Sequence, residues 1–126
     1  MKISPLLATL LIAILHATPC AASDLDAYGV SVNDTSPDPG DTVTVRWTAI
    51  NRDTGITGGV GSSYQGVMWS TDSSIRRNDT LLEKEYLGPL LSQQTSPETR
   101  VVNIPTWAVR GRTYWIGIYA DYDRHP

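Results

Sequence analysis

The sequence predicts an all-β protein built as an antiparallel β-sandwich. The segment 42–50 alternates between polar and apolar residues, which is typical of a strand with one buried face. Six such segments follow one another at regular spacing, separated by residues that favour turns. Glycine or proline interrupts every stretch with helical periodicity. Together these features favour a sandwich of the immunoglobulin-like class, in a chain long enough for one domain.

The first residues have the layout of a secretory signal peptide. Lys2 gives a positive start, the segment 6–15 is apolar apart from Thr9, and small residues follow up to Ser23. We expect cleavage after Ala22, so that residues 1–22 are the signal peptide and the protein is secreted or held at the cell surface or in the periplasm. Residues 23–126 then form the mature domain.

Two other fates of the leader are less favoured. A retained membrane anchor needs about 20 apolar residues, roughly twice the length of the run at 6–15. Lipidation of Cys20 would require processing directly after Pro19, whose fixed backbone suits a peptidase cleft poorly. Cys20 is the only cysteine, so the domain has no internal disulfide and depends on its hydrophobic core.

The first strands of the mature domain are expected at 26–32 and 42–50. The turn between them is Pro37–Asp41, in which proline presets φ and Gly40 accepts a positive φ. Val43, Val45 and Trp47 share one face of the second strand, so we expect all three in the core. The Gly-rich stretch 55–61 is expected to be a loose connection.

The remaining strands are expected at 64–71, 80–87, 99–104 and 114–121. In the last strand Tyr114 follows a glycine turn and resembles the tyrosine corner of such sandwiches, in which the phenol bonds to nearby backbone. The residues of these strands that we expect in the core, because they share an apolar face, are Val67, Trp69, Tyr114, Ile116 and Ile118.

Several segments taken together resemble a known family. In order along the chain they are 24–39, 41–51, 70–72, 79–82 and 111–122. The combination is similar to the CARDB domain, the cell-adhesion-related domain found in bacteria. The resemblance implies an immunoglobulin-like sandwich in a secreted or surface protein, often beside other modules, with adhesion as the proposed role.

Members of that family continue with a further strand beyond the segment that matches 111–122. The sequence ends at Pro126, so we expect a sandwich that lacks its last strand. A strand left without its neighbour exposes backbone donors and acceptors, which favours strand addition or self-association.

Trp115 and Tyr119 are the candidate ligand-binding residues. They lie on the strand face opposite to Tyr114, about 13 Å apart at ~3.3 Å per residue, with Gly117 between them. An open floor at Gly117 would let a glycan stack on both rings. The alternative is that the two rings only cover neighbouring side chains.

The loop 72–79 holds the candidate calcium ligands Asp72, Asn78 and Asp79. Calcium takes six to eight oxygen ligands, and the spacing does not fit an EF-hand. Arg76 and Arg77 oppose cation binding in the same loop. The alternative is that the carboxylates form side-chain-to-backbone turns, and no cofactor is expected.

The sequence offers little material for catalysis or for nucleic-acid binding. Of the two histidines, His16 lies in the leader and His125 is the penultimate residue, where chain ends are usually mobile. Glu83 and Glu85 are spaced as glycosidase carboxylates can be, but no cleft is indicated, and an exposed face of alternating charge explains them better. The net charge of −3 argues against nucleic acid as a partner.

We therefore expect a non-catalytic extracellular binding or adhesion module that contacts a surface glycan or protein. The alternative is a structural spacer or accessory domain within a larger secreted protein. The sandwich fold hosts both roles and does not decide between them.

Overall fold

The structure is a computed structural model, and it describes residues 11–15, 25–52, 59–60, 63–120 and 122. Every regular element in these ranges is a β-strand, and none of the described residues forms a helix able to cross a membrane. The expected cleavage site after Ala22, and Cys20, His16 and His125, lie outside the described residues. The strands are β1 (Leu11–Leu15), β2 (Leu25–Val32), β3 (Thr42–Asn51), β4 (Gly59–Val60), β5 (Ser63–Ser70), β6 (Thr80–Leu87), β7 (Leu90–Leu91), β8 (Thr95–Asn103) and β9 (Thr113–Tyr119).

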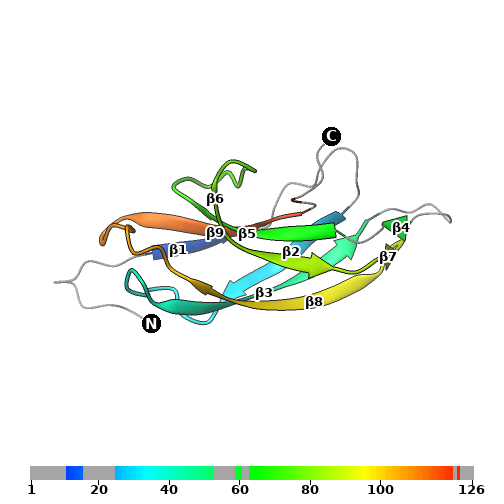
Figure 1. Ribbon diagram of the computed structural model, residues 1–126, viewed down its shortest axis with the longest axis horizontal. Helices are drawn as coiled ribbons and strands as arrows, with labels where there is room; N and C mark the ends of the chain where they lie inside the picture. Colours follow the sequence, from blue (N-terminus) through cyan, green and yellow to red (C-terminus); the bar gives the residue numbers. More distant parts are fainter. Residues whose placement is uncertain (1–10, 16–24, 53–58, 61–62, 121, 123–126) are drawn as a thin grey trace.

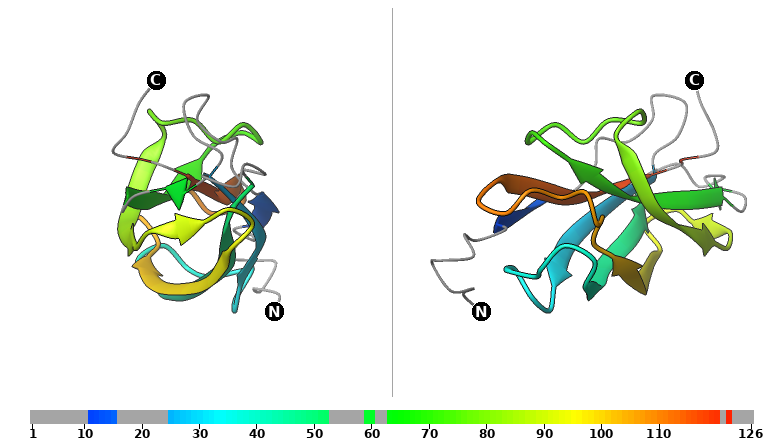
Figure 2. Two further views of the ribbon diagram at one scale, coloured as in Figure 1. Left: turned by 90° about the vertical axis from the view of Figure 1, so that its right-hand side faces the viewer. Right: turned by 60° about the vertical axis from the view of Figure 1, so that its left-hand side comes forward.

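The strands form two layers, which Figure 1 shows one above the other. One sheet has the order β1-β9-β5-β6, and the other has the order β2-β3-β8. All pairings are antiparallel except that of β1 with β9. A short β4–β7 pair adjoins the end where β6 and β8 are connected (Figure 2). The predicted all-β sandwich is confirmed.

The core lies between the two sheets and follows the alternation along the strands. All eight residues expected there have relative exposures of 2% or less: Val43, Val45, Trp47, Val67, Trp69, Tyr114, Ile116 and Ile118. The ring of Trp69 stacks on that of Tyr114, with centroids 4.5 Å apart and an angle of 25° between their planes. A second group of buried residues, which includes Leu25, Leu87 and Ala120, extends the apolar interior.

The tyrosine corner is present. The Tyr114 hydroxyl accepts a hydrogen bond from the backbone N–H of Val109 at 2.9 Å. This bond ties the start of β9 to the segment that leads into it. Gly40 has φ +87° in the turn before β3, as the sequence predicts for this position.

Four strands, β1, β4, β7 and β8, differ from the sequence prediction by more than two residues at an end or were not predicted. β8 begins at Thr95 instead of residue 99, because it is an edge strand, where Pro97 is tolerated. Residues 59–60, expected in a loose connection, form β4 and pair with residues 90–91, which form β7. The other residues of the expected connection 55–61 lie outside the described residues. β1 was not expected as a strand at all, since its apolar run fits a leader.

Candidate functional site

Tyrosines gather on the outer face of the β9–β5–β6 sheet. Tyr64 of β5 and Tyr86 of β6 stand directly opposite each other in register. Their rings meet edge to face, with centroids 5.7 Å apart and planes at 72°. Tyr64 is 38% exposed and Tyr86 57%, so both rings reach the surface. The Lys84 ammonium lies 4.8 Å from the Tyr64 ring centroid, in cation–π range.

Two further tyrosines continue this surface toward β9. The backbone N–H of Tyr122 donates to the Tyr64 carbonyl at 2.6 Å, which holds Tyr122 beside β5. Tyr119 and Tyr122 form a second edge-to-face pair, with centroids 6.3 Å apart. The Tyr122 ring lies over Gly66, where an added Cβ would meet it at 2.8 Å. A glycine at position 66 therefore makes room for this ring.

The loop between β5 and β6 folds onto the same face. Arg77 donates from Nη1 to the Tyr122 carbonyl, and its guanidinium carbon lies 5.1 Å from the Tyr122 ring centroid. We call the surface formed by Tyr64, Tyr86, Tyr119 and Tyr122 the tyrosine face. It has two edge-to-face ring pairs and one cationic side chain over a ring of each pair.

The two predicted ligand-binding residues lie four positions apart on β9, as expected, and both are half-buried. Tyr119 belongs to the tyrosine face through its contact with Tyr122. Trp115 is half-buried farther along β9, in register with Ser70. Gly117 is buried beside Met68, which is itself buried, so the open floor expected between the two rings is absent. That expectation was wrong because it considered one strand without the side chains of its neighbour.

The candidate calcium ligands are engaged within their own loop. The two oxygens of Asp72 accept from Arg76 Nη1 at 3.1 and 3.0 Å, and Oδ1 also accepts from the Ser74 N–H at 2.9 Å. The hydrogen bond from the Arg76 side chain is the main reason why the pKa of the Asp72 carboxyl is lowered. Asp79 accepts from the Arg76 N–H at 2.7 Å, and Asn78 is exposed. Across the described ranges, no three side chains of His, Cys, Asp or Glu are grouped to hold a metal ion.

Glu83 and Glu85 take part in an ion-paired cluster between the two sheets. Arg100 of β8 contacts Glu85 at 2.9 Å and Glu83 at 3.3 Å. The two glutamates are therefore not a freely exposed face of alternating charge, which corrects the sequence-based interpretation. Burial raises the pKa of the nearby Glu98 carboxyl; a hydrogen bond from Ser96 opposes this shift, and Glu85 reinforces it.

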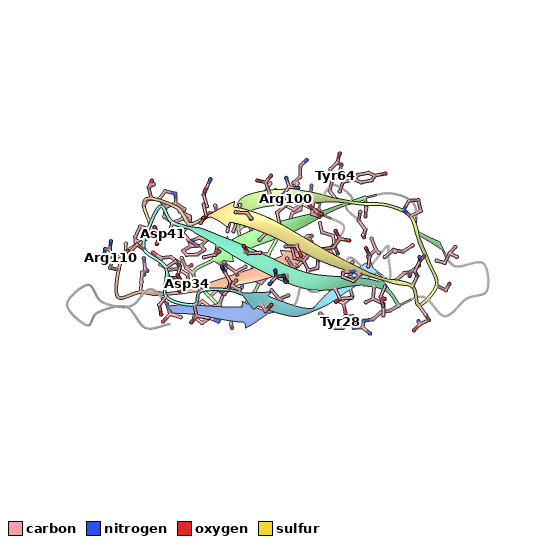
Figure 3. All side chains as sticks on the ribbon, turned by 90° about the horizontal axis from the view of Figure 1, so that it is seen from below. Tyr28, Asp34, Asp41, Tyr64, Arg100 and Arg110 are labelled. Carbon is pink, nitrogen blue, oxygen red and sulfur yellow. The ribbon has the colours of Figure 1, made fainter. Side chains whose placement is uncertain are left out.

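This cluster joins the open edges of the sandwich. β6 and β8 are the edge strands of different sheets, and Arg100 bridges them (Figure 3). A guanidinium held by two carboxylates accounts for the position of both glutamates. The glycosidase-like spacing of Glu83 and Glu85 thus serves a contact between sheets.

Sequence patterns alone do not indicate most of the tyrosine face. Tyr64, Tyr86 and Tyr122 were not singled out, although Tyr64 lies on the opposite strand face from Val67 and Trp69. That alternation was the available signal. Trp107 was missed as well; it is 57% exposed in the segment between β8 and β9.

Comparisons with protein-family models, with curated proteins and with solved structures found no match for this chain.

Proposed function

We propose that this protein is a non-catalytic extracellular binding or adhesion module that contacts a surface glycan through the tyrosine face. The observation that carries the proposal is the exposed edge-to-face pair of Tyr64 and Tyr86. Exposed aromatic rings held in fixed geometry stack on the C–H faces of sugars, and edge-to-face packing limits their motion. The resemblance to CARDB domains and the predicted leader support the same role and location.

The charges on this face favour a glycan that carries carboxylates. Lys84 lies over Tyr64, and Arg77 lies over Tyr122. Both cations are at the same surface as the rings, so a sugar stacked there would have its acidic groups near positive charge. We therefore expect stronger retention by a uronic-acid polysaccharide than by a neutral one.

Non-catalytic action is part of the proposal. Glu83 and Glu85 are ion-paired with Arg100, and Asp72 with Arg76. A general acid and base need to reach a substrate in a cleft. Such a constellation is not seen in the described part of the chain.

The test is affinity electrophoresis of the full chain in gels that contain neutral or uronic-acid polysaccharides. We expect retardation by the acidic polymer, and about tenfold weaker binding for each ring removed by Tyr64→Ala or Tyr86→Ala, equivalent to ~1.4 kcal/mol. Tyr28→Ala is the matched control. Tyr28 is also 38% exposed and also has a cation over its ring, Arg52 at 5.9 Å.

Tyr28 lies on the other side of the molecule from Tyr64 (Figure 3). Equal weakening by Tyr28→Ala and Tyr64→Ala would show that binding does not depend on the tyrosine face. No retardation in any polysaccharide would favour the alternative, a structural spacer or accessory domain of a larger secreted protein.

A further inference from the structure

The predicted leader supplies a strand to the sandwich. β1 (Leu11–Leu15) pairs in parallel with β9 and forms the edge of the four-stranded sheet. Its register runs from Leu11 opposite Thr113 to Leu15 opposite Gly117. The side of β9 that does not face β5 is therefore occupied by residues that the sequence assigns to a removable segment.

β9 has none of the features that protect a natural sheet edge. Such edges carry charges, proline or bulges that prevent pairing with another chain. β6 has Glu83, Lys84 and Glu85 in succession, and β8 has Pro97 followed by Glu98. β2 has a register shift between Tyr28 and Ser31.

The seven residues of β9, Thr113–Tyr119, contain no charge and no proline, and β9 pairs with β5 without a register shift. Tyr114 and Ile116 are 1% and 0% exposed. β9 thus has the composition of a strand that is paired on both sides.

The register indicates what kind of segment fits beside β9. Ile12 is aligned with Tyr114 and Ile14 with Ile116, the two core positions of this part of β9. A residue of a paired strand that stands opposite Tyr114 or Ile116 is on the same sheet face as that core residue. A matching strand therefore needs large apolar residues at alternate positions and no charge along this length.

We propose that the side of β9 that faces β1 is an acceptor site for a strand donated by another polypeptide. The donor is an extended, uncharged segment with large apolar residues at alternate positions, and it runs parallel to β9. Leu11–Leu15 fills this site within the chain and is replaced by the donor strand once the leader is removed. The inference depends on the predicted cleavage of the leader and is independent of glycan binding.

The experiment starts from the full chain with a specific protease site placed within residues 16–24. After cleavage, the N-terminal fragment should remain with the folded body on size-exclusion chromatography. A labelled peptide with the sequence of residues 9–17 should then exchange into the site. A peptide with Ile12→Lys and Ile14→Lys should bind at least tenfold more weakly.

Backbone pairing is tested with two N-methylated peptides. Residues of a parallel strand alternate in which neighbour their N–H groups face. One peptide is methylated at the amides of residues 12 and 14, and the other at the amides of residues 11, 13 and 15. Binding should be abolished in only one of the two peptides, the one whose methylated amides face β9. Equal binding by both peptides would indicate non-specific apolar association and would overturn the proposal.

Amide hydrogen exchange gives a readout that does not depend on the label. Amides of 113–117 that face the acceptor side should lose protection when the fragment is displaced and regain it with the unmodified peptide. The proposal is overturned if the fragment leaves a folded body and the peptide neither binds nor restores protection.

Discussion

Removal of the Tyr114 hydroxyl tests how the tyrosine corner contributes to stability. Tyr114→Phe deletes the bond from the Val109 N–H at 2.9 Å and keeps the ring stacked on Trp69. Val109 is 52% exposed, so its N–H can turn to water after the change. We expect a loss of about 1 kcal/mol in the free energy of unfolding, within the usual range for one hydrogen bond.

Tyr114→Ala removes the ring as well and should be far more damaging. The side chain is 1% exposed and stacks on Trp69 at 4.5 Å, so the substitution leaves a cavity in the centre of the core. Such changes cost about 3–5 kcal/mol, a large part of the ~5–15 kcal/mol that stabilises a typical domain.

Urea unfolding followed by tryptophan fluorescence measures both variants, with thermal melting as a second assay. For a domain of this size, the hydroxyl deletion should lower the Tm by ~4–8 °C. Tyr28→Phe, at an exposed position, is the control and should leave the Tm unchanged. The reasoning is refuted if Tyr114→Phe is indistinguishable from this control, or if it destabilises as much as Tyr114→Ala.

Three further predictions concern glycine packing, pH and metal. Gly66→Ala should destabilise by about 1–3 kcal/mol, because its Cβ would lie 2.8 Å from the Tyr122 ring; Gly88→Ala, with open space around it, is the control for the same urea assay. The pKa of Glu98 is raised in the folded state, so the stability that this carboxyl contributes is lost as the pH increases from its ordinary pKa of 4.5 through the raised pKa. Glu98→Gln should flatten this part of the curve of stability against pH. Calcium and a chelator should give the same Tm, because the carboxylates of the 72–79 loop are held by arginine and backbone N–H groups; a rise with calcium would contradict this.

The alternation of side chains was enough to predict most of the fold. Trp47 and Trp69 were assigned to the core from their own strands alone, and both are buried. Tyr114 was assigned a corner role from the glycine turn before it, and its hydrogen bond to Val109 is present. These features depend on residues that are close together in the sequence, so one sequence is enough to predict them.

The tyrosine face depends on register between strands, which local sequence does not provide. Tyr64 and Tyr86 meet because β5 and β6 align them, and Tyr119 meets Tyr122 where the chain leaves β9. A shift of one residue in either strand would turn a ring to the other face. The alternation along β5 indicates which way Tyr64 points, but it does not indicate which ring Tyr64 meets.

β1 shows a different limit. A short apolar run has no period that separates a leader from a buried strand. Its pairing with β9 joins positions roughly one hundred residues apart in the chain, which no local pattern indicates. The contact of Arg100 with Glu85 is not indicated by any local pattern either, because the two residues belong to different sheets.

The most direct test of the binding proposal is an NMR titration of the isotope-labelled full chain with the polysaccharide that retards it most. Chemical-shift changes should concentrate at the tyrosine face, at residues 64, 86, 119 and 122, and should be absent around Tyr28. Shifts confined to the β2–β3–β8 sheet, or no shifts with any glycan at saturation, would contradict the proposed function.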